Sequence, residues 1–371
     1  MVGCSTAFHL AEAGIDVLLV EKSALGSGSS SKAAGGVRAC FSDPVNVALG
    51  KRSLELFGEM GRRPGGEIDL RRVGYLFLLT TAEQVEEFGA SVEVQNSLGV
   101  RSRIVDADEA HRLSPLASVD DVLAGCWSPD DGTCTPEAGV QAYAAGARRH
   151  GARLLTGAEV VGADVVGGEV RGVTVRVEGT DHVVATGTVV VAAGAWSGVV
   201  GDLLGIDLPV TPLRREIVVT GPIADLPASI PMTVDAGTTF YFHGEGRGLL
   251  AGWSDPSVLP GFDLRRDPAY LEGIVAMAER RAPRLLEAEL VGGWAGLYEI
   301  SPDHDGIVGE SGAVSRLLYA TGFSGHGYLQ APAVGEVLRD LVLGRTPLID
   351  ITPLSADRFT TGSPRAERHL V

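Results

Sequence analysis

The chain has 371 residues, of which 45% are hydrophobic and 21% are charged, and its formal net charge is −16 at pH 7. This composition is typical of a globular protein and excludes a disordered one. The negative charge argues against nucleic acid or an anionic membrane as a partner, and the length favours two domains.

The cysteines show neither a CxxC motif nor a metal-ligand spacing. Cys126 and Cys134 could pair, but reduced thiols and a cytoplasmic location are the favoured interpretation. We expect no signal peptide, because no charged region followed by an apolar run precedes the fold. Residues 183–201 lack charge over a length that could span a membrane. Their glycines and short β-branched core instead predict a buried strand that runs into a turn, so we expect no membrane span.

The first 22 residues predict half of a dinucleotide-binding unit. Residues 3–14 predict a short helix between two glycines, and residues 15–22 predict a buried strand that ends in Glu21 and Lys22. In such a unit a glycine lets the helix pack on the strand, the helix N-terminus faces a diphosphate, and the acid binds ribose hydroxyls. Gly3 and Glu21, 18 positions apart, suit these two roles.

A strand and two further glycines should precede Gly3 in this unit, and the sequence lacks them. We therefore interpret Met1 as an internal methionine taken for the start. Intact-mass analysis of the native protein tests this hypothesis, and a native N-terminus at Met1 would contradict it.

Residues 23–36 are small and rich in serine and glycine, and they lead to Val37 and Arg38. A flexible linker has the same composition. Because this segment follows the ribose-binding acid directly, we favour a loop whose amides and hydroxyls approach a cofactor.

The central part of the chain alternates predicted helices and strands. Thr135 and Pro136 mark a clear helix start, with an N-cap and a proline in the first turn. The residues before position 211 predict helices at 44–60, 83–98 and 136–150 and strands at 75–79, 153–156, 158–166, 170–178 and 188–193. We expect the strands from 153 to 178 to form a meander with a Gly167-Gly168 turn.

The last part of the chain begins with antiparallel strands and returns to mixed character. Strands are predicted at 216–220, 238–243, 248–253 and 317–322, and helices at 268–281 and 333–343. Asp267 is placed to cap the first of these helices, and the polar tail from Ser355 is expected to fray. The fold class is therefore α/β, α+β overall, with one discontinuous nucleotide domain and one substrate domain built on antiparallel strands.

Four segments together resemble a known superfamily. The half motif ending in Glu21, the segment 189–197 and the segment 319–328 resemble the D-amino-acid oxidase superfamily of FAD-dependent amine oxidoreductases. The segment 294–309 resembles its branch of sarcosine oxidases, dimethylglycine dehydrogenases and amino-acid dehydrogenase β-subunits. The similarity spans nearly the whole chain. It implies a Rossmann-like FAD-binding domain at 1–43, 136–210 and 301–371, and a substrate domain at 44–135 and 211–300.

The resemblance also implies the residues that contact FAD. The backbone of Val160 would meet the adenine, and the helix after the loop 322–328 would aim its N-terminus at the flavin O2 region, where reduction leaves negative charge. The implied cofactor residues are Gly3, Glu21, Lys22, Ser30, Ser31, Gly35, Gly36, Val160, Ala193, Gly194, Trp196, Gly322, Phe323, Ser324, Gly325, His326, Gly327 and Tyr328.

The chain departs from its relatives at the positions that tether flavin and bind carboxylates. Lys32 stands near the point where some relatives have a flavin-linked histidine, and no cysteine follows Cys134. FAD is therefore expected to bind non-covalently. Two positions where relatives carry a carboxylate-binding lysine or arginine are Leu329 and Tyr298. Arg38 is the first candidate to take over that role.

The implied reaction is oxidation of a secondary or tertiary amino acid, of the sarcosine, dimethylglycine, proline or glycine type. Hydride passes to FAD N5, and the resulting imine hydrolyses. The candidate catalytic residues are His326, Arg38, Tyr241, His243, Tyr298 and Tyr328. A packed aromatic ring, a structural histidine or, for Arg38, a simple salt bridge is the alternative for each.

Several alternatives stay open at this point. The run Asp303-His304-Asp305 is interpreted as a turn, and no metal site is expected. A non-catalytic flavoprotein subunit or assembly factor would share the same segments, and an NAD(P)-dependent dehydrogenase would share the first 22 residues. Electrons would pass to O2 or to a redox partner, and the chain could be one subunit of a hetero-oligomer.

Overall fold

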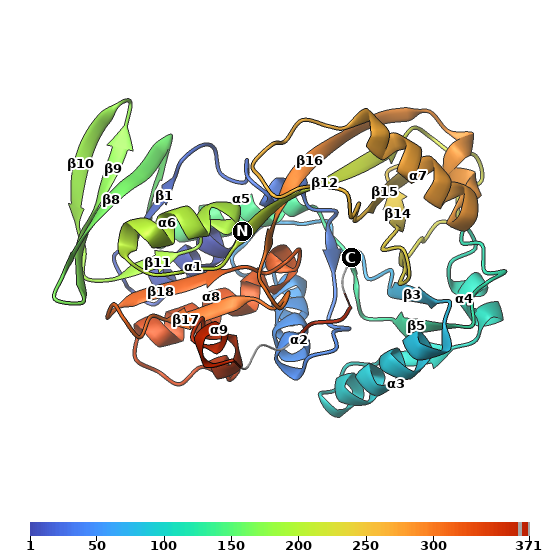
Figure 1. The fold of residues 1–371 in the computed structure, drawn as a ribbon, viewed down its shortest axis with the longest axis horizontal. Coiled ribbons are helices and arrows are strands. Elements are labelled where there is room, and N and C mark those ends of the chain that lie inside the picture. Colours follow the sequence, from blue (N-terminus) through green and yellow to red (C-terminus); the bar gives the residue numbers. More distant parts are fainter. Residues whose placement is uncertain (363–365, 370–371) are drawn as a thin grey trace.

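The computed structural model describes residues 1–362 and 366–369. Figure 1 shows two halves side by side, one with packed helices and short sheets and the other with a large twisted sheet. The long strands β12 (Thr211–Thr220) and β16 (Leu290–Ile300) run from the middle of the molecule into the large sheet.

Four helices pack together in the first half. They are α1 (Val2–Glu12), α2 (Pro44–Gly58), α5 (Pro136–Arg149) and α8 (Gly327–Val342). Their shared core is aromatic and aliphatic, with Phe8, Phe57 and Tyr143 almost fully buried. The predicted starts and ends of α1, α2 and α5 are confirmed to within two residues.

Short parallel strands accompany these helices. β1 (Leu18–Glu21) pairs with β7 (Arg153–Thr156), and β11 (Val189–Val191) pairs with β18 (Leu317–Thr321), both in parallel. β17 (Ile307–Glu310) adds to β18 in the antiparallel direction. Helix α1 packs between the two pairs, and a Cβ on Gly3 would make ordinary contacts with both, 3.7 Å from Ala192 and 3.9 Å from Leu19. Parallel strands covered by helices confirm the α/β class.

A separate meander contains β8 (Ala158–Val166), β9 (Glu169–Val177) and β10 (Thr180–Ala185). The turn between β8 and β9 is the predicted glycine pair, and both glycines have positive φ. The prediction that residues 153–156 open this meander is wrong. They form β7, which pairs in parallel with β1 in a different sheet, from the Leu18–Arg153 pair to the Glu21–Thr156 pair.

The second half is built on an eight-stranded, mostly antiparallel sheet. One face is covered by α4 (Ala107–Leu113) and α7 (Pro268–Arg281), and the other by α3 (Ala82–Ser97) and residues 34–40. Asp267 caps α7 as predicted, accepting from the Ala269 N–H at 3.0 Å. The strand order is β16, β12, β15 (Gly248–Trp253), β14 (Tyr241–Glu245), β13 (Met232–Asp235), β3 (Tyr75–Leu79), β5 (Ala124–Ser128) and β4 (Arg103–Val105).

The remaining elements are short. They are β2 (Gly36–Val37), β6 (Gly132–Thr133), α6 (Ser197–Leu204), α9 (Arg358–Thr361), and the 3-10 turns η1 (Ser30–Lys32), η2 (Gly194–Trp196), η3 (Pro283–Glu287) and η4 (Thr352–Leu354). No helix among the described residues combines the length and the apolar character that a membrane crossing requires. All four cysteines are buried and unpaired.

Two predictions near the C-terminus are wrong. Helix α8 begins at Gly327 instead of 333 and runs through Pro332. Pro332 is the sixth residue of the helix and has no N–H to donate to the Tyr328 carbonyl, so α8 tolerates the loss of one internal hydrogen bond. Among the described residues of the tail, Arg358 pairs with buried Asp303 at 2.8 Å and Glu367 is buried, so these residues do not fray. The prediction for residues 363–365 and 370–371 lies outside the described residues.

The division into an FAD-binding domain and a substrate domain stays a prediction. Helix α2, assigned to the substrate domain, packs on α8 of the other one. Ser53 Oγ donates to the Gln330 carbonyl at 3.2 Å, and Arg52 pairs with Glu336 at 2.8 Å.

Candidate active site

The start of α1 lies beside the loop that follows β1. The Met1 nitrogen donates to Ser30 Oγ at 2.7 Å, and Gly3 occupies the first turn. No side chain caps α1, so its first N–H groups can serve a ligand. Glu21 accepts from the Ser23 N–H at 2.8 Å at the end of β1. Lys22 lies on the surface and pairs with Glu159 of β8.

The loop 23–36 is hydrogen-bonded to a helix of the first half and to a strand of the large sheet. The Ser31 hydroxyl donates to the carboxylate of Glu137 in α5. The Trp294 indole N–H in β16 donates to the Lys32 carbonyl at 2.8 Å. This loop therefore joins the helical half to the large sheet.

Glycines allow close approach where the loop ends. Gly35 has φ +84°, and a Cβ there would lie 2.3 Å from the Cys134 carbonyl oxygen. A Cβ on Gly36 would lie 2.5 Å from the Tyr75 hydroxyl. Gly35 therefore requires glycine for packing and for conformation, and Gly36 only for its close packing against Tyr75.

The turn 193–196 lies between β11 and the loop after β18. The Gly194 carbonyl accepts from Thr321 Oγ1 at 3.2 Å. Val160 lies in β8, where it packs with Val20 of β1. The contact of the Val160 backbone with an adenine stays a prediction.

The loop 322–328 carries three residues in the left-handed region. Gly322, Ser324 and Gly325 have φ of +68°, +52° and +104°. A Cβ on Gly325 would lie 2.6 Å from the Tyr298 ring, so the loop touches β16. Helix α8 follows, and His326 makes no side-chain cap. A second uncapped helix N-terminus therefore lies beside this loop.

Glu299 contacts these segments, and it is not among the site residues predicted from the sequence. Its carboxylate accepts from Thr321 Oγ1 at 2.9 Å, and the backbone N–H groups of Gly322 and Phe323 also donate to it. Burial raises the pKa of Glu299 to about 7, and these hydrogen bonds oppose the rise. Its only sequence signal is an acid inside the largely apolar segment 294–300.

The candidates Arg38 and His326 lie side by side, with 3.1 Å between the Arg38 Nη2 and the His326 Nε2. Arg38 is fully buried, and it also donates to the carbonyls of Cys40 at 2.6 Å and His369 at 2.5 Å. Burial lowers the pKa of His326, and the Arg38 charge lowers it further, so the imidazole is neutral. The Arg38 guanidinium is occupied by protein acceptors, which does not favour it as the carboxylate-binding group.

Three tyrosines, which we call the tyrosine wall, lie on the face of the large sheet that meets the two loops; Tyr75 and Tyr241 are buried and Tyr298 is half-buried. Tyr241 in β14 and Tyr298 in β16 were candidates, and Tyr75 in β3 was not. Tyr75 reaches Gly36 and Tyr298 reaches Gly325, so the wall contacts both loops. Burial raises the pKa of all three hydroxyls, which are therefore protonated.

His243 links the large sheet to the loop 23–36 by a hydrogen bond. Its Nε2 lies 2.9 Å from the Ala34 carbonyl, and its Nδ1 lies 2.9 Å from the Gly244 carbonyl. Burial lowers the pKa of His243, so the neutral ring donates to one of these carbonyls at a time. This placement supports a positioning role more than a contact with substrate.

Two other candidates point away from the tyrosine wall. Tyr328 lies in the helical core, where its hydroxyl is 3.3 Å from Cys134 Sγ and its ring stacks on Phe57. Trp196 stacks on Phe262 with ring centroids 5.5 Å apart. The predicted contacts of both with a cofactor stay predictions.

The arrangement fits a dinucleotide cofactor. Two uncapped helix N-termini, of α1 and α8, supply N–H donors for its anionic groups. Glycines at 35 and 325 let the two loops pack closely against the Cys134 carbonyl and the Tyr298 ring. Among the described residues no group of three or more histidine, cysteine or acidic side chains could hold a metal ion. Asp303 instead pairs with Arg358, and His304 adopts a turn conformation with φ +63°.

A family model described as FAD dependent oxidoreductase matches residues 1–341. The chain belongs to this family. The resemblance drawn from the four segments and the identity of the cofactor as FAD are thereby confirmed. The family is described as one of oxidoreductases, and the match covers nearly the whole length of this chain.

Three similar proteins illustrate the family. Mitochondrial dimethylglycine dehydrogenase of Mus musculus is 32% identical over 96% of this chain and 43% of its own length. L-Proline dehydrogenase from P. horikoshii has a TM-score of 0.91 and 31% identity, covering 98% of this chain and 96% of its own. Glycine oxidase from Geobacillus kaustophilus has a TM-score of 0.83 and 27% identity, with 95% of both chains covered. The chain thus spans less than half the length of the dimethylglycine dehydrogenase.

Proposed function

We propose that this chain oxidises a secondary or tertiary amino acid, of the sarcosine, dimethylglycine, proline or glycine type, to an imine that hydrolyses. The observation that carries the proposal is the tyrosine wall (Tyr75, Tyr241 and Tyr298), which contacts both glycine loops. Similar proteins named for dimethylglycine, proline and glycine support this substrate class.

FAD supplies the hydride acceptor when it is bound. The start of α1, with Gly3 and Ser30 beside it, would hold the diphosphate, and Glu21 would bind the ribose. The loop 322–328 and the N-terminus of α8 would hold the flavin and stabilise negative charge on its pyrimidine side. With no histidine in 29–34 and no cysteine after Cys134, we propose that FAD is held non-covalently.

The chain's own residues would bind the amine and keep it reactive. An amine must be unprotonated to lose hydride, because an ammonium has no lone pair to stabilise the developing imine. The neutral His326 imidazole and the protonated tyrosines place no negative charge beside the amine to favour its ammonium form. Their packing also excludes water and fixes the substrate over the flavin.

One alternative keeps the fold without the reaction. A non-catalytic subunit or assembly factor would bind FAD with the same loops and would turn over no amine. The NAD(P)-dependent alternative gains no support, because the matching family uses FAD. O2 or a redox partner as electron acceptor, membership of a hetero-oligomer and a cytoplasmic location stay predictions.

Anaerobic absorption spectra test the proposal. The FAD-loaded protein is mixed in turn with sarcosine, dimethylglycine, proline and glycine, and bleaching of the flavin band is followed. We expect at least one of them to bleach the band, and a flavin that none of them reduces would contradict the proposal and favour the alternative. Acid precipitation should leave all the flavin in the supernatant if FAD is non-covalent.

Two tyrosine variants make the test specific to the wall. Tyr298→Phe should slow reduction at least fivefold, because it removes a hydroxyl at the junction of sheet and loop. Tyr319→Phe is the matched control, since its buried hydroxyl accepts from the Ala356 N–H at 3.0 Å in another part of the fold. Equal effects of both variants would count against a role for the wall.

A further inference from the structure

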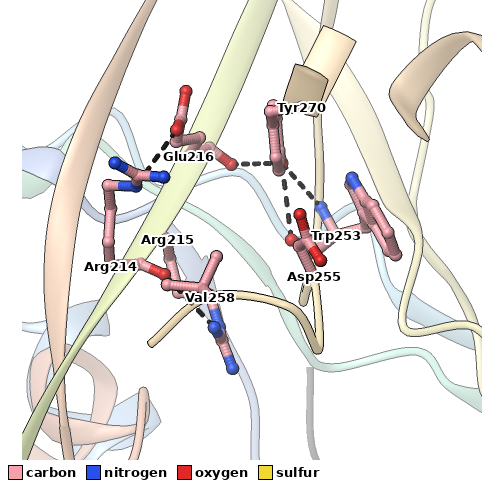
Figure 2. Close-up of a pocket in the computed structure, with 7 residues that line it drawn as sticks. All are labelled: Arg214, Arg215, Glu216, Trp253, Asp255, Val258 and Tyr270. Carbon is pink, nitrogen blue, oxygen red and sulfur yellow. Dashed lines mark hydrogen bonds and ion pairs between the residues drawn. The ribbon is translucent and has the colours of Figure 1, made fainter. Parts of the chain in front are cut away.

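Arg215 is an arginine at a position where the strand pattern places an apolar residue. In β12, residues 215, 217 and 219 share one face, and Ile217 and Val219 pack there with Tyr75 and Tyr241. Arg214 and Glu216 lie on the opposite face. Figure 2 shows the Arg215 guanidinium pointing away from the Arg214–Glu216 pair. Arg215 therefore extends on the side of the sheet that meets the cofactor loops.

Arg215 lacks the acidic partner that its neighbours have. Arg214 pairs with buried Glu216 at 3.2 Å and with Asp267 at 3.6 Å. Arg215 has no carboxylate within ion-pair distance in the described part of the chain. Its one hydrogen bond is from Nη1 to the Arg214 carbonyl at 3.2 Å, and its buried Nε has no partner.

The surroundings of Arg215 are aromatic and close to the first loop. Its guanidinium carbon lies 5.4 Å from the centre of the Tyr298 ring. In the sheet register Arg215 is opposite Gly296, and a Cβ there would lie 3.1 Å from Lys32 Cβ. The pocket drawn in Figure 2 also contains Asp255, whose carboxylate accepts from the backbone and hydroxyl of Ser257.

A guanidinium in such a place is costly without a counter-charge. Desolvation disfavours a buried cation, and burial lowers the pKa of Arg215. Asp255 acts on Arg215 only from beyond ion-pair distance, so a ligand carboxylate would supply a negative charge in direct contact and would accept two parallel N–H bonds from the planar guanidinium. The adjacent Tyr298 ring stabilises the cation from its face.

We propose that Arg215 binds the carboxylate of the substrate and thereby selects amino acids over simple amines. This inference rests on the proposed amine oxidation and deepens it. It assigns to Arg215 the role that the occupied Arg38 does not fill.

Equilibrium binding of two matched ligands tests the assignment. Pyrrole-2-carboxylate and pyrrole-2-carboxamide have nearly the same shape and differ in charge, and neither carries an oxidisable amine. Their dissociation constants are measured by calorimetry with the FAD-loaded protein. We expect the wild-type chain to prefer the carboxylate at least tenfold.

Three variants separate charge recognition from packing. Arg215→Met should weaken carboxylate binding at least tenfold and change carboxamide binding less than twofold, while Arg215→Lys should restore part of the preference. Arg214→Met is the matched control, because it removes the neighbouring charge on the other face and should leave the preference intact. Thermal unfolding of each variant shows that it is folded.

The outcomes distinguish this inference from the proposed function. A wild-type chain that binds both ligands equally, or neither, would overturn the assignment, as would an Arg215→Met chain that keeps the preference. Failure of the amine oxidation shows separately, as a flavin that no amino acid bleaches. The preference for the carboxylate can be measured in that case too, because binding needs no turnover.

Discussion

Glu299 is a carboxyl group held inside the protein by donors from its own chain. Thr321 and the backbone of the loop 322–328 donate to it, and burial raises its pKa to about 7. The same carboxyl lies against two glycines of the candidate cofactor site, with its oxygens 3.6 Å from a Cβ on Gly194 and 3.0 Å from one on Gly327. The protonation state of Glu299 therefore affects the conformation of the loop 322–328.

The raised pKa of Glu299 predicts how stability depends on pH. The folded chain holds this proton more tightly than the unfolded chain, whose glutamates titrate near 4.3. The contribution of Glu299 to the free energy of unfolding therefore falls as pH rises from about 4.3 to about 7, by roughly 3 kcal/mol. Glu299→Gln removes this titration, so the variant should gain stability relative to wild type between pH 5 and pH 8.

Urea unfolding at the two pH values, at fixed FAD concentration, measures this change. Glu310→Gln is the control, because Glu310 is exposed on the neighbouring strand β17 and accepts from the Arg316 N–H. The difference in unfolding free energy between Glu310→Gln and wild type should be the same at both pH values. If the difference in unfolding free energy between Glu299→Gln and wild type did not change with pH, Glu299 would not have the raised pKa on which this prediction rests.

Elements with a strong local pattern could be predicted from the sequence. Strand β3 and helix α7 have the predicted bounds, because a short apolar run, an Asp267 cap and Pro268 are local signals. Strand β16 could not be predicted, since its glycines and mixed residues carry no period and its pairing with β12 is a long-range contact. For the same reason, part of the candidate site could not be predicted from the sequence. Arg215 and Glu299 are charged residues whose neighbours are set only by tertiary pairing.

Helix α7 is held on the large sheet by a buried ion pair, which predicts a large effect of one substitution. Arg281 donates to Asp235 at 2.7 Å and to Asp121 at 2.8 Å, and the side chains of Arg281 and Asp235 are 1% and 2% exposed. Arg281→Met leaves the Asp235 carboxylate buried with no counter-charge, which should cost about 3–5 kcal/mol.

The adjacent Arg280 gives a matched control for this pair. It contacts the same Asp121 but is 54% exposed, so Arg280→Met should cost less than about 1 kcal/mol. Both values come from urea unfolding. Similar losses for the two variants would show that burial of the pair does not determine its contribution.

At the scale of the whole molecule, the candidate site lies where the two halves meet. The tyrosine wall comes from the large sheet, the helix N-termini come from the other half, and the loop 23–36 joins them. The chain also returns to this junction near its end, where His369 stacks on Phe88 of α3 with ring centroids 3.9 Å apart. The C-terminal residues 366–369 thus help to hold the halves together.

Glu367 is the centre of this C-terminal contact and predicts a pH-dependent loss of stability. Its carboxylate accepts from the backbone and hydroxyl of Ser42, from the Asp43 N–H and from the Asn46 amide. Burial alone would raise the pKa of Glu367, but the nearby charges of His369 and Arg38 and these donors lower it. A lowered pKa means that its contribution is present above about pH 4.3 and is lost as pH falls below that value.

Glu367→Gln should therefore cost about 2–3 kcal/mol at pH 7, because an amide offers one acceptor oxygen to several buried donors. The difference from wild type should shrink between pH 4.5 and pH 3. Arg368→Gln is the control on the same segment, since Arg368 is 66% exposed and its pairing with Glu87 is long, at 3.6 Å. It should change stability by less than about 1 kcal/mol at either pH. If Glu367→Gln were as mild as this control, the buried contacts of residues 366–369 would not join the halves, and the site would be held by the loop 23–36 and the β12–β16 pairing alone.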